Sequence, residues 1–155
     1  MSSKAKLGVR TQLKIGDGAS PEVFTTIAEI LTLKFSGKKV DLVKVSNQDS
    51  SADANGQYFH EYITGFADGG TCDFTANFIP NDTSQDSFFN KLDGKPHNFK
   101  IVLPNNPTSS PLTTYGTYAF AGYIIEDSLD FPIDKQMTKS GKIQITGPVT
   151  YTANA

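Results

Sequence analysis

The sequence contains one cysteine, no tryptophan and no long hydrophobic run. Because Cys72 has no second cysteine to pair with, an internal disulfide is excluded, and folding in a reducing cytoplasm is expected. No apolar stretch approaches the roughly 18 residues of a transmembrane helix, so we expect no membrane span. The opening residues, MSSKAKLGVR, lack the apolar core of a secretory leader, so we expect no cleaved leader.

Clustered positive charge is also missing from the chain. Lysine and arginine number 14 against 16 aspartate and glutamate residues, which gives a formal net charge of −2. The adjacent pair Lys38–Lys39 is isolated beside a glycine and is typical of a solvated turn. Sequence-independent binding of nucleic acid requires a cationic surface that neutralises phosphates, and the sequence does not predict one.

The usual signatures of catalysis and metal binding are not found either. The sequence has no nucleophile elbow and no phosphate-binding loop. His60 and His97, the two histidines, lack ligand-type spacing to each other and to Cys72. Residues 53–56 resemble part of a calcium loop, but the position of the bidentate acid falls on Tyr62. We therefore expect no enzymatic activity, no metal and no cofactor.

Aromatic and β-forming residues dominate what is present. The chain has 11 phenylalanines and 6 tyrosines, many threonines, serines and asparagines, and few strong helix formers. This composition favours an all-β or β-dominated fold. The length suits one domain over residues 1–155, and we expect flexible ends at 1–6 and 151–155.

Hydrophobic alternation predicts seven to eight strands. They are expected at 7–15, 40–45, 58–63, 71–78, 97–103, 115–125 and 142–146. Apolar residues on both faces of 115–125 predict a central strand that is covered on both sides. The segment Val23–Phe35 fits both a helix and a strand, and its threonine and isoleucine content favours a strand with a bulge near Glu29.

The stretch from Gly65 to Phe78 is expected to organise the fold. Its first part, Gly65 to Gly70, reads as a turn, because glycine reaches positive φ and the carboxylate of Asp68 can bond the local backbone. The strand that follows alternates, and it should bury Cys72, Phe74, Ala76 and Phe78.

One short helix is predicted over about Thr83–Asp93. Asp82 is a suitable N-cap, with Gln85 three residues later in a capping-box spacing. Gly94 lies where a C-terminal cap belongs. The apolar face, which should pack on the sheet, consists of Phe88, Phe89 and Leu92.

A polar loop, Ser46–Gln57, separates the strands predicted at 40–45 and 58–63. It contains no large apolar side chain, so it must be exposed in the isolated subunit. The two strands and this tip together predict an extended hairpin. Residues 104–114, with three prolines, predict a further loop or edge excursion.

The aromatic residues Tyr58, Phe59, Tyr62 and Phe66 allow two interpretations. They could form a sugar-stacking platform on a monomeric β-sandwich that binds carbohydrate or protein. Alternation sends Phe59 to the face opposite Tyr58 and Tyr62, and no tryptophan is present, which favours packing in a core or an interface instead.

Six blocks follow one another along nearly the whole chain, and each alone is a weak turn or strand pattern. The blocks are Thr11–Gly18, Pro21–Glu29, Gly65–Phe78, Phe99–Pro104, Tyr118–Tyr123 and Gly141–Pro148. Together and in this order they resemble the major tail tube proteins of long-tailed, lambda-like phages (siphoviruses). The chain departs from the family pattern at 104–114 and 130–139.

The resemblance implies a β-sandwich or half-barrel with one flanking helix, and a structural virion protein rather than an enzyme. Six copies would close into a ring, and rings would stack into a tube through which DNA passes without specific binding. Implied partners are a tape measure, a tail terminator and tail-tip proteins, with assembly in the host cytoplasm and a place in the virion tail. A ring subunit of a contractile injection or secretion system is an alternative.

A loop that could contact the next ring is the exposed tip of the predicted hairpin. The candidate ring-stacking residues are Asn47, Gln48, Asp49, Asp53, Asn55 and Gly56.

Overall fold

The computed structural model describes residues 5, 7–106 and 113–154. Within them the chain forms nine strands and one helix, so the predicted β-dominated fold is confirmed. The elements are β1 Gln12–Gly16, β2 Phe24–Thr26, β3 Ile30–Ser36, β4 Lys39–Lys44, β5 Tyr62–Asp68, β6 Thr71–Asn77, α1 Thr83–Phe89, β7 His97–Asn106, β8 Thr113–Asp130 and β9 Thr138–Ala153.

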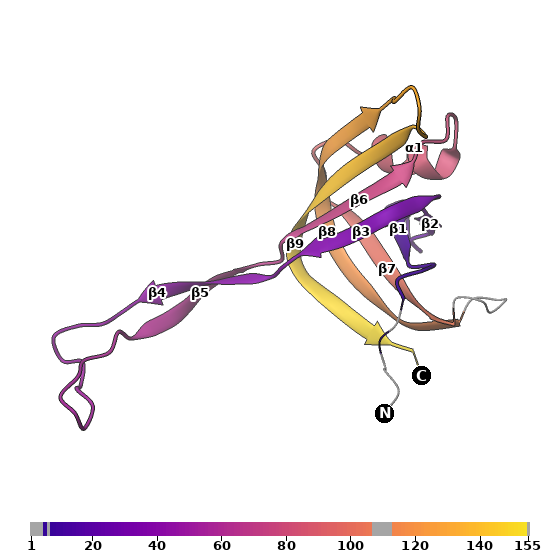
Figure 1. Cartoon of the computed structure of the whole chain (residues 1–155). Coiled ribbons are helices and arrows are strands. Elements are labelled where there is room, and N and C mark those ends of the chain that lie inside the picture. Colours follow the sequence, from indigo (N-terminus) through magenta and orange to yellow (C-terminus); the bar gives the residue numbers. More distant parts are fainter. Residues whose placement is uncertain (1–4, 6, 107–112, 155) are drawn as a thin grey trace.

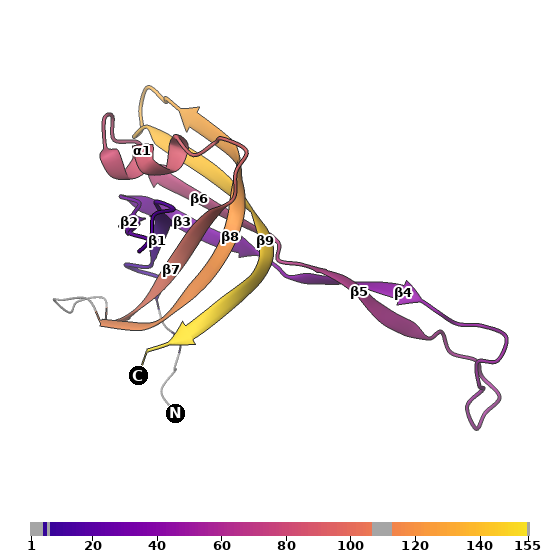
Figure 2. The same cartoon turned by 180° about the vertical axis from the view of Figure 1, so that it is seen from behind.

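Seven strands form one antiparallel sheet in the order β2-β1-β7-β8-β9-β6-β3, and β4 and β5 form a separate two-stranded sheet. The large sheet curls into a half-barrel, with α1 over one end (Figure 1 and Figure 2). Its longest strands, β8 and β9, pair along almost their whole length, with register shifts at Ala119/Ala121 and Ile124/Glu126. Such irregularities bend and twist a strand, which lets the sheet curl.

Aromatic side chains fill the inside of the curl. The ring of Phe88 meets those of Phe74 and Phe89 edge-on, with centroid distances of 4.7 and 4.8 Å. Phe99 stacks on Phe120 at 5.5 Å. These five rings are buried, and edge-to-face and offset contacts of this kind stabilise a core beyond simple area burial.

The helix starts as predicted and ends early. The Asp82 carboxylate accepts a hydrogen bond from the backbone N–H of Ser84, but the helix stops at Phe89, with Asn90 as its C-cap. Leu92 lies beyond the end and is 51% exposed, so its predicted core role is wrong. The two phenylalanines reach the core because they lie, with Gln85, on the buried side of the helix.

Gln85 ties this helix to the sheet. Its side chain is 1% exposed, and its amide oxygen accepts a hydrogen bond from the N–H of Ile79. The amide nitrogen donates to the carbonyl oxygens of Ala28 and Asn77. The buried amide is thus hydrogen-bonded at both ends, which is the condition for burying it without a large penalty.

The turn chemistry predicted at Asp68–Gly70 is present, but the chain does not reverse there and Gly65 is not part of a turn. Gly65 lies inside β5, and β5 continues into β6 through a kink at Gly69–Gly70. The Asp68 carboxylate accepts from the N–H of Gly70, whose φ is +84°. A Cβ at Gly70 would overlap the carbonyl oxygen of Ser36, so this position requires glycine.

Beyond the kink, β6 alternates as predicted. Cys72, Phe74 and Ala76 are buried. Phe78 follows the end of the strand and is only half-buried, where its ring meets Phe131 at 6.2 Å. The segment Val23–Phe35 adopts the predicted strand conformation, as β2 and β3, and Glu29 between them has a φ of +54°.

Several predicted strand ends are wrong. The first strand begins at Gln12 rather than Leu7, and the side chains of Leu7 and Val9 are exposed. Tyr151, predicted to lie in a loose tail, pairs in β9 with Tyr118 of β8. These ends depend on pairing with partners distant in sequence, which local alternation does not reveal.

The predicted 104–114 loop is shorter than expected. Residues 104–106 belong to β7, residues 113 and 114 begin β8, and 107–112 lie outside the described residues. Most of the predicted flexible segment 1–6 and residue 155 also lie outside them. β8 is central, as predicted, but Tyr123 and Ile125 on its second face are exposed, so this strand is covered on one side only.

Candidate assembly surface

A two-stranded arm, residues 39–68, projects from the half-barrel (Figure 1 and Figure 2). Its strands β4 and β5 continue the line of β3 and β6, because Ser36 pairs with Thr71 and Lys39 with Asp68. The predicted hairpin is therefore present, although its second strand begins at Tyr62 instead of Tyr58. Every residue of β4 and β5 is exposed.

The arm carries apolar side chains on both faces. Directly opposed residues of an antiparallel pair share a face, and Leu42 opposes Thr64 while Val43 opposes Ile63. Alternation along β4 therefore places Val40 and Leu42 on one face, together with Tyr62 opposite Lys44, whereas Val43 and Ile63 lie on the other face. Phe66 lies at the register shift between Val40 and Leu42. Phe66 is 91% exposed.

Such an arm is an unusual element in an isolated subunit. A two-stranded ribbon has no core of its own and is at best marginally stable in water. The solvent face of an antiparallel sheet is normally polar, whereas both faces of this arm combine large apolar side chains with polar ones. Contiguous exposed apolar surface marks an interaction site, so the arm is a candidate assembly surface.

The tip of the arm, residues 46–57, is exposed or half-buried and folds on itself. The side-chain oxygen of Asn47 accepts from the N–H of Asp49. One carboxylate oxygen of Asp53 accepts from the N–H groups of Asn55 and Gln57, at 2.9 Å each. The carboxylate thus holds a local turn, which is the ordinary role of aspartate in loops.

The predicted ring-stacking residues therefore lie together at the far end of the arm. Asp53, Asn55 and Gly56 form one turn, in which Gly56 has a φ of +79° and donates its N–H to the carbonyl oxygen of Asp53. Asn47, Gln48 and Asp49 belong to the neighbouring turn. Contact of these residues with another ring stays a prediction.

Polar side chains join the two sides of the tip where it meets the arm. The hydroxyl oxygen of Ser46 accepts from the N–H of Glu61 at 2.7 Å. The side-chain nitrogens of Lys44 and His60 are 3.1 Å apart. These contacts fix the direction in which the tip leaves the arm.

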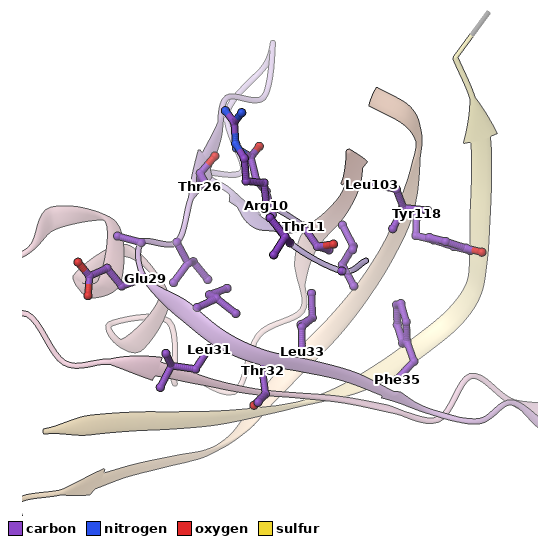
Figure 3. A pocket seen from close by; sticks show the side chains of 17 residues that line it. Arg10, Thr11, Thr26, Glu29, Leu31, Thr32, Leu33, Phe35, Leu103 and Tyr118 are labelled. Atoms are coloured by element: carbon purple, nitrogen blue, oxygen red, sulfur yellow. The ribbon is translucent and has the colours of Figure 1, made fainter. Parts of the chain in front are cut away.

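An apolar hollow of about 880 Å³ opens where the half-barrel fails to close, between residues 8–12 and β3 (Figure 3). Leu33, Phe35, Leu103 and Tyr118 project toward it, while Arg10 and Glu29 lie at its margin. Sequence reasoning did not predict this hollow, because it depends on how far the sheet curls.

Chemically reactive groups do not gather in the described part of the chain. No three metal-ligating side chains cluster among the described residues. Cys72 is fully buried, and burial raises the pKa of its thiol to about 12, so the thiolate nucleophile is suppressed. His97 contacts Asp93 at 2.9 Å, an exposed pair that lowers the pKa of this carboxyl group. The described helix is too short to cross a bilayer.

Comparison with solved structures reveals the same fold in tail and tube assemblies. A chain from the tail of an empty gene transfer agent particle, refined with C6 symmetry, gives a TM-score of 0.70 at 17% identity over 96% of this chain and 100% of that chain. The SPP1 tail tube gives 0.65 at 14% identity, covering 97% and 80% of the respective chains.

A chain from the sheath–tube complex of an extracellular contractile injection system, in its extended state, gives 0.65 at 11% identity, covering 98% and 94%. No family model and no curated protein matches the sequence. At these identities the likeness shows a shared fold, and this chain has it over almost its whole length.

Proposed function

We propose that this protein is a tail tube subunit, which assembles into six-membered rings that stack into the tail tube of a long-tailed phage. The arm is the observation that carries this proposal. Its two apolar faces have no partner within the described chain, whereas assembly would bury both faces at once. The tail-derived structures of the same fold support the proposal.

An arm that projects from one copy onto a different surface of the next copy makes a heterologous contact. Such contacts generate rings where the rotation closes and filaments where it does not, and a stacked-ring tube uses both. The exposed edge of β3 is also available to a neighbouring strand, and pairing in the ring would remove the aggregation hazard of this edge.

The formed tube would conduct DNA without holding it. Partners that begin, measure and end the tube, namely tail-tip, tape measure and tail terminator proteins, belong to the same proposal. The protein would then act in the virion tail after assembly in the host cytoplasm.

A tube subunit of a contractile injection system is the second candidate. The matches to the sheath–tube complex and to the baseplate of the anti-feeding prophage favour it, the latter with a TM-score of 0.67 at 9% identity. Both candidates predict the same self-assembled tube. They differ in whether a sheath protein co-assembles on the outside of the tube.

Light scattering combined with electron microscopy tests the proposal. Purified protein is concentrated stepwise, and we expect rings or tubes to form above a threshold concentration. A persistent monomer at high concentration would refute it. Specific signals on a glycan array, from a protein that stays monomeric, would support the carbohydrate-binding alternative instead.

A further inference from the structure

The four strands β3, β6, β9 and β8 present one polar face to solvent. The opposite face carries the core residues Phe74 and Ile143, so alternation places Asp73 and Lys142 on the polar side. Small neutral side chains dominate here. Two registered rows of uncharged side chains cross the sheet, Thr32–Thr75–Ser140–Ser128 and Ser36–Thr71–Gln144–Tyr123.

Between these neutral rows lies a single charged row whose signs alternate. Lys34 of β3 opposes Asp73 of β6, and Asp73 opposes Lys142 of β9. Lys142 in turn opposes Glu126 of β8. Opposed side chains in an antiparallel sheet have their Cβ atoms about 4.5–5.5 Å apart, so each lysine has a carboxylate as its nearest charged neighbour across the strands.

A small hollow of about 160 Å³ lies under this row. Asp73, Glu126 and Lys142 line it, together with the hydroxyl-bearing Thr75 and Ser140. The two hydroxyl oxygens are 3.3 Å apart, and one carboxylate oxygen of Asp73 is buried without a hydrogen-bond partner among the described residues. This acceptor belongs to the residue that directly opposes Lys142 on the neighbouring strand.

We infer that this polar face lines the channel of the assembled tube, and that Asp73 and Glu126 are the residues that keep its lysines from holding the DNA backbone. The inference rests on the proposed tube function and goes beyond it by naming the surface that DNA would meet. The apolar arm and the core-facing side of the sheet are unsuited to that contact.

The physical reason is counterion release. A lysine that neutralises a phosphate releases a condensed cation from the DNA, and this release favours binding. Each neutralised phosphate makes the slope of log K against log salt concentration more negative by about 0.9. A lysine with a carboxylate in register on each side, as Lys142 has in Asp73 and Glu126, gains less from a phosphate than an isolated lysine does. Repeated around a ring, the row stays neutral, and DNA can slide past it.

The test compares tubes of the wild type, of Asp73→Asn/Glu126→Gln, and of the matched control Asp86→Asn/Asp134→Asn. Both double variants change the net charge equally, but Asp86 and Asp134 are exposed on α1 and on the loop before β9. Tubes are incubated with a short fluorescent DNA duplex over a salt series and then pelleted. We expect Asp73→Asn/Glu126→Gln tubes alone to retain roughly tenfold more DNA at low salt, with a steeper salt slope.

A labelling experiment locates the face independently of DNA and of the charge variants. Thr146, exposed on the same side of β9, is replaced by cysteine, with Asp134→Cys as the control. The buried Cys72 adds no background. In tubes, we expect Thr146→Cys to react with a small maleimide but not with a maleimide carried on a large protein, whereas Asp134→Cys should react with both.

The outcomes distinguish failure of the proposed tube function from failure of the channel assignment. Failure of the wild type to form tubes overturns the proposed function and this inference together. Tubes that react with the large reagent at Thr146→Cys as readily as at Asp134→Cys overturn only the inference. Equal DNA retention by the two charge variants also overturns it. If only Asp73→Asn/Glu126→Gln fails to assemble, labelling at Thr146→Cys decides: protection from the large reagent supports the inference, and reaction with it overturns the inference.

Discussion

Truncating Phe66 should block assembly while leaving the subunit folded. The side chain is 91% exposed on the arm, so Phe66→Ala removes almost no packing from the monomer. A surface change of this kind normally alters the free energy of unfolding by less than about 0.5 kcal/mol. A buried aromatic such as Phe88 would behave in the opposite way, since its loss costs about 3–5 kcal/mol of stability.

The effect on assembly follows from the surface that the contact would bury. Phenylalanine buries about 150–250 Å², and truncation to alanine removes on the order of 100 Å² of it, worth about 2.5 kcal/mol at 25 cal/mol per Å². Because 1.4 kcal/mol is a factor of ten in an association constant, the critical concentration should rise roughly 50- to 100-fold.

Sedimentation of assembled material over a concentration series measures the critical concentration, and urea unfolding measures subunit stability. Ile133→Ala is the matched control, because Ile133 is fully exposed but lies outside the arm, in the loop before β9. An unchanged critical concentration for Phe66→Ala would refute the role of the arm. An equal rise for Ile133→Ala would show that general surface hydrophobicity, and not the arm, drives assembly.

Four further predictions concern the tip, the helix and the thiol. Deleting Ala52–Gly56 should leave the subunit folded but impair tube growth, since this part of the tip contains no core residue; unchanged tubes in electron micrographs would place stacking elsewhere. Gln85→Leu should lower the free energy of unfolding in urea by about 3 kcal/mol, because it leaves buried backbone groups without this partner; a loss below about 1 kcal/mol would contradict that role. The hydroxyl and then the N–H of Ser84 hold the pKa of Asp82 below its ordinary value of 3.8, so its stabilising contribution is present above that value and is lost as pH falls through the lower, folded-state pKa. Unfolding free energy measured against pH should therefore fall less on the acid side for Asp82→Asn, and a profile identical to that of the wild type would count against the cap. The thiol of Cys72 should resist a disulfide reagent at pH 8 until the protein unfolds, and rapid reaction of the folded protein would show that it is accessible.

The sequence pattern correctly predicted features that depend only on residues close together in the chain. Alternation identified the buried side of β6, and the N-cap spacing identified the start of α1 at Asp82. The prediction failed at strand ends and at the kink, which depend on pairing between strands distant in sequence. Tyr151 joins β9 only because β8 offers a partner at Tyr118, and the Asp68–Gly70 stretch is a kink because β3 and β4 run alongside it.

The assembly surface was predicted only in part. The polar tip was identified from its lack of apolar residues, and the hairpin from the strands that flank it. The apolar character of both arm faces was missed, although Val40, Leu42 and Val43 already break strict alternation in the sequence. The charged row from Lys34 to Glu126 could not be predicted, since it depends on the registers of three strand pairs.

Cryo-electron microscopy of the assembled wild-type protein, with helical reconstruction, tests the central claim most directly. The account predicts a tube of stacked six-membered rings in which both faces of the arm, including Phe66 and Ile63, are buried between subunits. A particle that remains monomeric, or a tube in which the arm extends freely into solvent, would contradict it.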